Sequence, residues 1–255
     1  MPVRLVPIRL TGWICAVSCA AVMGLVTLDR ESSARAVDEA RVIVVDAGHG
    51  GVDGGASGMG ILEKDVTLDV ARRLRHALEA DGWRVRMTRD VDTDVSRLYE
   101  SDLPTRHKRD LQNRLDFVRN ARAVGVISIH VNSSTNPHDS GPLVFYDVHS
   151  EAGRHLAQRV QEALGQVSGS TQRAVGRKNL FLIRHAPCAA ILAELGFLTN
   201  AADAARLKDA HYLQRIALAI ADASSRALQD AAVPPPFHKH SARADWVRPS
   251  FAAPG

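Results

Sequence analysis

Apolar residues recur along the chain with two periods, which predict strands that alternate with helices. Residues 42–45 form a continuous β-branched run, as expected for a strand that is covered on both faces. From Val66 to Leu78, apolar residues return at every fourth position, which predicts an amphipathic helix over about residues 64–80. The same patterns predict further strands over residues 84–88, 126–130, 142–148, 180–183 and 190–193. They also predict helices over residues 105–123 and around 156–164, a further helical segment capped by Asn200, and a final helix that includes Leu213 and Ile220 and ends at about residue 230.

This alternation is typical of an α/β fold. We expect a three-layer sandwich, with a mostly parallel or mixed central sheet flanked by helices. The stretch from Arg89 to Pro104 is polar and is expected to be a loop. In such sheets, functional side chains gather on the loops that leave the strand ends. Those loops are therefore the first place to look for chemistry.

The first 36 residues have the layout of an export signal. Arg4 and Arg9 precede an apolar run over residues 10–28, and residues 34–36 offer a small-x-small cleavage site. The run is about 20 residues long, so an uncleaved membrane anchor is the alternative. Either way, the arginines keep the N-terminus cytoplasmic and place the rest of the chain outside. We expect an exported protein that is secreted or anchored, with membrane contact only through this segment.

The rest of the chain is expected to form one domain and a tail. Residues 41–231 contain all the predicted strands and helices that follow the export signal. Three consecutive prolines at residues 234–236 cannot continue the last helix. Residues 232–255 are therefore interpreted as a Pro-rich, disordered tail.

Composition excludes one class of partner. The formal net charge is +4, but residues 1–36 carry four Lys or Arg and two Asp or Glu, and residues 233–255 carry three and one. The ends account for the whole excess, so the domain is neutral, and the basic pI of the whole chain does not indicate nucleic-acid binding. Only Cys188 lies within the domain, which excludes an internal disulfide there and favours a small buried hydrophobe.

Three candidate metal ligands lie where strands or loops end. His49 follows the first strand between glycines, Glu63 closes a glycine-rich loop, and His130 ends a later apolar strand. Two imidazoles and one carboxylate are a known protein ligand set for a catalytic zinc ion, which leaves one position for water. Glu194 directly follows another apolar strand, and a carboxylate near such water can act as a general base.

Each of these residues also has a structural interpretation. His49 suits a hydrogen-bonded turn, and the glycines around it suit a tight turn or an anion-binding loop. Glu63 suits a helix N-terminus, where its charge complements the dipole. His130 suits a buried histidine that bonds to backbone. Glu194 is harder to explain in this way, because an unpaired carboxylate beside an apolar strand is costly to bury.

Four segments in order resemble the zinc-dependent N-acetylmuramoyl-L-alanine amidase family. They are Val44-Val45-Asp46-Ala47-Gly48-His49-Gly50-Gly51, Leu62-Glu63-Lys64-Asp65, Ser128-Ile129-His130-Val131-Asn132 and Glu194-Leu195-Gly196-Phe197-Leu198-Thr199-Asn200. The resemblance spans about residues 42–225. It implies that His49, Glu63 and His130 bind one zinc ion per chain and that Glu194 is the catalytic acid/base. It also implies peptidoglycan as the substrate, cut between the lactyl group of muramic acid and L-alanine.

A narrower resemblance is to the spore-cortex amidases of bacilli and clostridia. It rests on residues 62–68 and on the basic segment at residues 106–111. It implies a role in forming muramic-δ-lactam for germination, and a location at the forespore. Ala47 and Ala189 stand where the family often has proline, which affects loop stiffness and no ligand.

Two rival functions stay open, and so do the finer contacts. One rival is a zinc peptidase that cuts within the stem peptide, and the other is a non-catalytic wall-binding domain. Residues 132–140 and the loop after Glu194 are expected to line the substrate groove, with Asn132 and Arg184 as contacts or as structural hydrogen-bonding residues. The sequence leaves open whether an activator protein is needed to hold zinc.

Overall fold

The computed structural model describes residues 42–230. The predicted export signal at residues 1–36 and the predicted tail at residues 232–255 lie outside the described residues, so both stay predictions. Between residues 42 and 230, no helix combines the length and apolar character that a membrane span requires.

The described chain is built on one six-stranded mixed sheet, in the order β4-β1-β5-β8-β6-β7. Four neighbouring strands, β4, β1, β5 and β8, are parallel, whereas β6 runs antiparallel to β8 and pairs in parallel with the edge strand β7. The bounds are β1 Val42–Ala47, β4 Arg84–Met87, β5 Gly125–Asn132, β6 Leu143–Asp147, β7 Val175–Arg177 and β8 Ala189–Phe197.

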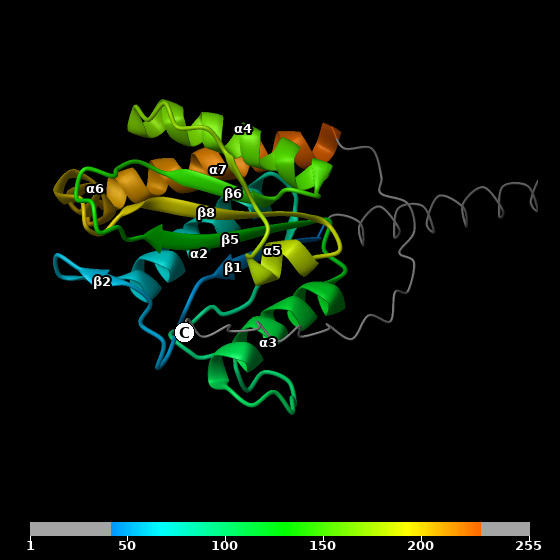
Figure 1. The fold of residues 1–255 in the computed structure, drawn as a ribbon. Coiled ribbons are helices and arrows are strands. Elements are labelled where there is room, and N and C mark those ends of the chain that lie inside the picture. Colours follow the sequence, from blue (N-terminus) through cyan, green and yellow to red (C-terminus); the bar gives the residue numbers. More distant parts are fainter. Residues whose placement is uncertain (1–41, 231–255) are drawn as a thin grey trace, which may run out of the picture.

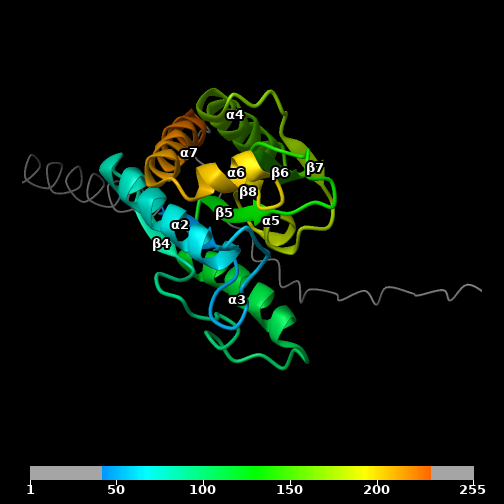
Figure 2. The same ribbon diagram turned by 90° about the vertical axis from the view of Figure 1, so that its left-hand side faces the viewer.

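Helices cover both faces of the sheet, as Figures 1 and 2 show. One face carries α2, α4 and α7, and the other carries α3 and the short α5, while α6 follows the end of β8. The bounds are α2 Glu63–Ala80, α3 Arg106–Ala121, α4 Glu151–Ser168, α5 Phe181–His185, α6 Ala201–Leu207 and α7 Ala210–Asp230. The expected three-layer α/β sandwich with a mixed sheet is confirmed.

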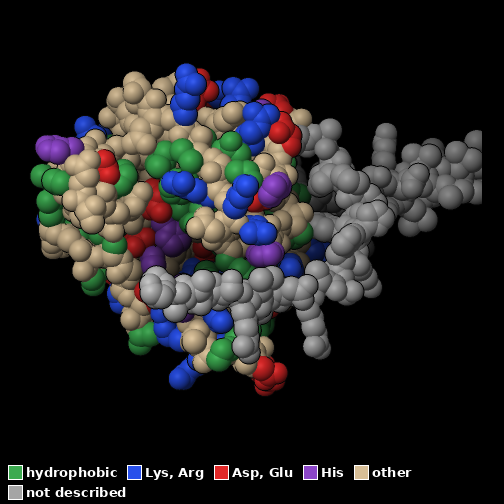
Figure 3. Space-filling view, in the orientation of Figure 1, with side chains coloured by type: hydrophobic (Ala, Val, Ile, Leu, Met, Phe, Trp, Pro, Cys, Tyr) green, Lys and Arg blue, Asp and Glu red, His purple; other side chains and the backbone are tan. Residues whose placement is uncertain are grey.

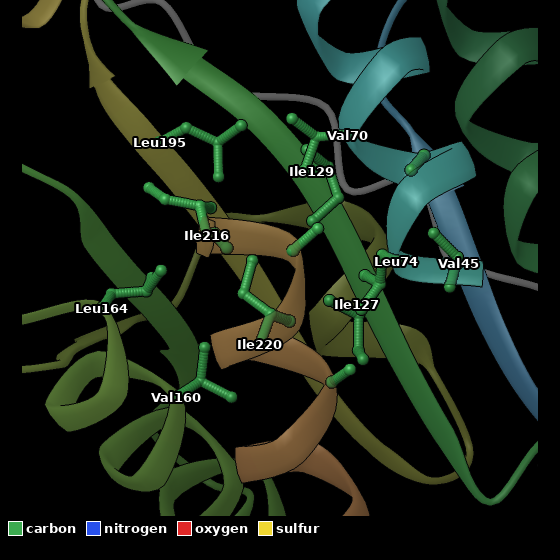
Figure 4. Close-up of a cluster of buried hydrophobic side chains, with 14 of the residues drawn as sticks. Val45, Val70, Leu74, Ile127, Ile129, Val160, Leu164, Leu195, Ile216 and Ile220 are labelled. Atoms are coloured by element: carbon green, nitrogen blue, oxygen red, sulfur yellow. The ribbon is translucent and has the colours of Figure 1, made fainter. Parts of the chain in front are cut away.

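Two apolar clusters hold these layers together. Because β-strand side chains alternate between faces, Ile43 and Val45 of β1 enter the larger cluster and Val44 enters the smaller one. The larger cluster packs Ile216 and Ile220 of α7 between the sheet and its neighbouring helices (Figure 4). The helix over residues 64–80 is confirmed, since its buried residues include the apolar stripe that predicted it.

Three local expectations need correction. Residues 180–183 were expected to form a strand, but Phe181–His185 is helical and the strand β7 lies just before it. A run of four apolar residues fits either structure, because periodicity cannot distinguish them at that length. The strands predicted at 126–130 and 190–193 continue to Asn132 and Phe197, so His130 and Glu194 lie inside strands and not at their ends. The glycine-rich loop contains a small hairpin of β2 Ser57–Gly58 and β3 Ile61–Leu62.

The strand order reverses at β1. From β1 the chain passes through α2 to β4 on one side, and then through α3 to β5 on the other side of β1. The two connecting helices, α2 and α3, lie on opposite faces of the sheet. Open α/β sheets bind ligands near such a reversal, outside the carboxyl ends of the strands.

Candidate metal centre

The three predicted metal ligands converge at this end of the sheet. His49 Nε2 lies 3.1 Å from Glu63 Oε1, and His130 Nδ1 lies 3.0 Å from the same oxygen. One ligand atom from each residue can be chosen so that all three lie within 4.8 Å of one another. Bonds of about 2.0–2.1 Å in tetrahedral geometry place neighbouring ligand atoms about 3.3–3.4 Å apart. The cluster therefore has the donor atoms and nearly the spacing to hold a metal ion.

His130 is placed by the register of three parallel strands. It pairs with Glu194 of β8, and on its other side Gly48 donates to the carbonyl of the preceding Ile129 at 3.0 Å. A Cβ atom on Gly48 would lie 2.5 Å from His130 Cε1, far closer than van der Waals contact. Glycine is thus required beside the imidazole, which explains one glycine of the sequence motif.

Glu63 is held by backbone amides at both oxygens. Oε1 accepts a hydrogen bond from Val131 N at 3.0 Å, and Oε2 accepts one from Ala56 N at 2.7 Å. Burial alone raises the pKa of Glu63, but hydrogen bonds and charge from the two histidines hold that pKa well below its usual value. The carboxylate is therefore ionised and oriented, as a metal ligand must be.

His49 has an acidic partner that the sequence did not single out. Its Nδ1 lies 3.1 Å from Asp53 Oδ1, and Asp53 Oδ2 lies 3.2 Å from Arg106 Nη2. Arg106 also donates to Asp94 Oδ2 at 2.9 Å. Burial lowers the pKa of His49, but Glu63 and Asp53 raise it above its usual value. A carboxylate on the outer nitrogen of a ligand histidine fixes the tautomer and the ring orientation.

We expect Asp53→Asn to weaken metal binding about 10–100-fold, because such outer partners contribute that much to affinity. The measurement is zinc affinity of the purified protein by competition with a chromophoric chelator. Asp69→Asn is the matched control, since Asp69 pairs only with Arg73 on the exposed side of α2. An unchanged affinity in Asp53→Asn would show that the contact to His49 has no role in metal binding.

Glu194 lies beside the cluster and lacks a partner among the described residues. It occupies β8 in register with His130, so both side chains point to the sheet face of α3 and α5. Part of the side chain reaches solvent, but Oε2 is buried and forms no hydrogen bond within residues 42–230. Burial raises the pKa of Glu194 to about 7. In Figure 3, histidine and acidic side chains gather in a hollow beside the ends of these strands.

For the other residues considered from the sequence, the structure gives local contacts or burial and, within residues 42–230, no hydrogen bond to the cluster. Asn132 ends β5, and its Oδ1 accepts from Ser133 N at 2.8 Å. Arg184 donates to the carbonyl of Lys178 at 2.7 Å, a local contact within its own segment. Burial raises the pKa of Cys188 to about 12, in agreement with its interpretation as a small apolar residue.

The two loops expected to line a groove are joined at a buried aspartate. Asp203 Oδ2 accepts from Gly141 N at 2.7 Å, next to the loop after β5, and from Phe197 N at 3.0 Å at the end of β8. The same two segments meet again where Asn200 donates to Pro137 O at 2.8 Å. Asn200 also caps α6, as predicted.

Comparison with known proteins agrees with this geometry. A family model described as N-acetylmuramoyl-L-alanine amidase matches residues 43–226. The germination-specific N-acetylmuramoyl-L-alanine amidase of Bacillus subtilis is 33% identical over 196 residues, which is 76% of this chain and 83% of that protein.

Two solved structures share the fold at similar identity. The CwlD amidase from Clostridioides difficile, in complex with the GerS lipoprotein, has a TM-score of 0.69 and 29% identity, covering 74% of this chain and 99% of that one. The amidase AmiC2 of Nostoc punctiforme has a TM-score of 0.63 and 31% identity, covering 75% and 98%.

Proposed function

The chain belongs to the N-acetylmuramoyl-L-alanine amidase family of peptidoglycan hydrolases, and from this premise we propose how it acts and where. We propose that zinc, one ion per chain, is held by His49, Glu63 and His130, with Glu194 as the catalytic acid/base. The observation that supports the proposal most strongly is the convergence of three candidate ligand side chains next to Glu194, whose Oε2 is buried and has no hydrogen-bond partner within residues 42–230.

The ligand set suits a hydrolytic metal ion. Zinc held by two imidazoles and a carboxylate polarises a carbonyl and lowers the pKa of water to about 7. Glu63 is ionised in this fold and fixed by two amides, while the histidines present Nε2 and Nδ1 to it. The side chains of His49 and His130 are 25% and 21% exposed, so solvent reaches this cluster.

Glu194 supplies the proton transfers in the proposed mechanism. Its ionised form accepts a proton from the water that attacks the lactyl carbonyl of muramic acid. The protonated form then donates to the nitrogen of L-alanine, so that the amine leaves as a neutral group. In the metal-free protein, burial raises the pKa of Glu194 to about 7, and the charge of a bound zinc ion would lower it from there. General acid–base catalysis is most effective when the pKa lies near the working pH.

We further propose that the substrate is spore cortex and that the cut serves muramic-δ-lactam formation. Support comes from the germination-specific relative and from the CwlD structure. CwlD was solved with the GerS lipoprotein, which supports an accessory protein for this chain too. An exported location follows from the signal-like segment at residues 1–36 and from the wall substrate of the family.

Digestion of purified sacculi tests the proposal. We expect intact stem peptides that begin with L-alanine, together with glycan strands that keep every muramic acid, because the bond cut is the lactyl amide. The measurement is mass spectrometry of products from cortex and from vegetative wall, with and without a chelator. Fragments cut within the stem would instead indicate a peptidase, and faster digestion of vegetative wall would contradict the cortex proposal.

A further inference from the structure

Two arginines are buried directly behind the metal centre. Arg89 follows β4 and Arg114 lies in α3, and each is 3% exposed. Burial, together with the like charge of Arg114, lowers the pKa of Arg89. Two buried guanidinium groups are costly unless every donor finds an acceptor. The acceptors that they find include the carbonyls of residues 47 to 49, in the segment that presents His49.

Arg89 joins two of the ligand-bearing segments. Its Nε donates to Ala47 O at 3.0 Å, and its Nη2 donates to Gly48 O at 2.9 Å. The same Nη2 lies 2.8 Å from Lys64 O and 3.0 Å from Thr67 Oγ1, both in the first turns of α2. One planar group thus connects the loop before His49 to the helix start that presents the glutamate ligand.

Arg114 joins that loop to the sheet. Its Nη2 donates to His49 O at 2.8 Å, and its Nη1 donates to Ala47 O at 2.8 Å and to Asp46 Oδ1 at 2.6 Å. Asp110, one helical turn earlier in α3, accepts from its Nε at 2.7 Å. Five donors in a rigid fork make these contacts together, which a lysine ammonium cannot do.

Asp46 extends the connection toward the third ligand. It is 1% exposed, and its Oδ2 accepts from Ser128 Oγ at 2.6 Å. Ser128 lies two residues before His130 on the same face of β5. Burial alone raises the pKa of Asp46, but the charge of Arg114 and the bonds from Ser128 and Thr88 lower that pKa to about 2. The carboxylate therefore stays ionised and keeps its hydrogen bonds.

The fixed carbonyls support an unfavourable backbone conformation. His49 has a φ of 60°, in the left-handed region that is unfavourable for residues other than glycine. The carbonyls of three successive residues, 47 to 49, are held by the two guanidinium groups. Since peptide planes are rigid, holding the carbonyls also fixes the direction of the His49 side chain.

We propose that Arg89 and Arg114 are positioning residues, which set the affinity and the coordination geometry of the metal centre. We call Arg89, Arg114 and Asp46 together the arginine clamp. The proposal rests on the proposed function only in taking this centre to bind zinc. If the two arginines only stabilised the fold, their replacement would lower the stability of the protein but leave the ligand geometry, and therefore the zinc affinity, of the folded protein unchanged.

The test measures metal binding in the full chain with Arg89→Lys and Arg114→Lys. We expect each to bind zinc about 10–100-fold more weakly, the range found for groups that orient metal ligands. We also expect the visible absorption of the cobalt-substituted protein to lose intensity, as tetrahedral coordination is distorted. Thr67→Val is a milder variant that keeps both arginines but removes the hydroxyl beside Gly48 O and Arg89, and a smaller loss of about 3–10-fold is expected.

Two controls separate positioning from general stability. Arg226→Lys changes an exposed arginine that bonds only to Asp222 within α7. Leu164→Ala opens a cavity in the core on the other face of the sheet. Both should keep the parental zinc affinity and cobalt spectrum, although Leu164→Ala lowers the melting temperature.

Either of two results would overturn the proposal. The first is that Arg89→Lys, Arg114→Lys and Thr67→Val all melt at a lower temperature than the parent yet bind zinc within twofold of it. The second is an equal loss of affinity in Leu164→Ala. Wall digestion by the parent protein tests the amidase function separately, so an active parent with unaltered clamp variants would refute the clamp alone.

Discussion

Replacing Glu194 with glutamine is expected to reduce amidase turnover about 10²–10⁴-fold while zinc binding stays within twofold of the parent. The factor is the usual contribution of a positioned general acid or base. Glutamine has nearly the same shape but cannot accept the proton from water. Zinc is retained because Glu194 is not among the three clustered ligand residues. The measurement is the rate of release of stem peptides from sacculi, beside metal analysis of the same sample.

Glu194→Gln reduces turnover, but it is expected to stabilise the metal-free protein. The pKa of Glu194 is about 7 in the folded state and about 4.3 in an unfolded chain. The stability that the protonated carboxyl provides is thus complete below about pH 4 and is lost as pH rises through 7. Above pH 7, the parent must bury an ionised carboxylate, and Glu194→Gln is expected to be more stable by at most about 3–4 kcal/mol, the free energy that corresponds to the difference between these two pKa values.

Thermal or urea unfolding of the chelated proteins at pH 4.5 and pH 8 measures this difference. The gap between variant and parent should be small at the lower pH and large at the higher pH. Glu162→Gln, an exposed position on α4, is the control and should change neither turnover nor the pH profile. Full turnover in Glu194→Gln would remove this residue from the mechanism.

His130→Ala is expected to abolish both zinc binding and turnover at ordinary zinc concentrations. The ring is one of the three proposed ligands, and its loss also leaves Glu63 Oε1 without the contact at 3.0 Å. The variant should still fold, since the imidazole side chain is 21% exposed and the β5 backbone does not depend on it. Chelation of the parent should produce the same loss, reversible on adding zinc. The measurements are zinc content after dialysis and the rate of wall digestion.

His76→Ala is the matched control for the loss of a histidine. His76 lies on α2 and is 70% exposed, with only a distant contact to Glu79. This variant should keep zinc and activity. If His130→Ala retained one tightly bound zinc ion, the assignment of this residue as a ligand would be wrong.

The sequence predicted the fold class, and it also selected the three residues that cluster in the structure and the carboxylate beside them. Each of these residues is close to an element whose apolar pattern is clear, and parallel strands bring their carboxyl ends to one edge. Long helices such as α2 and α7 were predicted within a few residues, because many apolar positions define each of them. Short elements, such as the helix at Phe181–His185, have too few positions to define a period.

What the sequence could not show is which distant residues support the centre. Arg89 lies in a stretch that reads only as a polar loop, and Arg114 has the spacing of an ordinary helix residue. Their roles depend on contacts across 41 to 65 positions of sequence. Asp53 lies only four residues after His49, but both are in a loop. A loop has no regular periodicity, so the sequence could not predict that the Asp53 side chain points toward His49.

The three proposed ligands would also determine when a metal ion can be captured. Sixty-seven positions separate Glu63 from His130, and the two meet only after β1, α2 and β5 have assembled. A denatured chain offers no comparable chelate, so by mass action a zinc ion held by these residues would bind the native state almost exclusively. The stability of the folded protein would consequently depend on the free zinc concentration around it, and low zinc would reduce stability as well as activity.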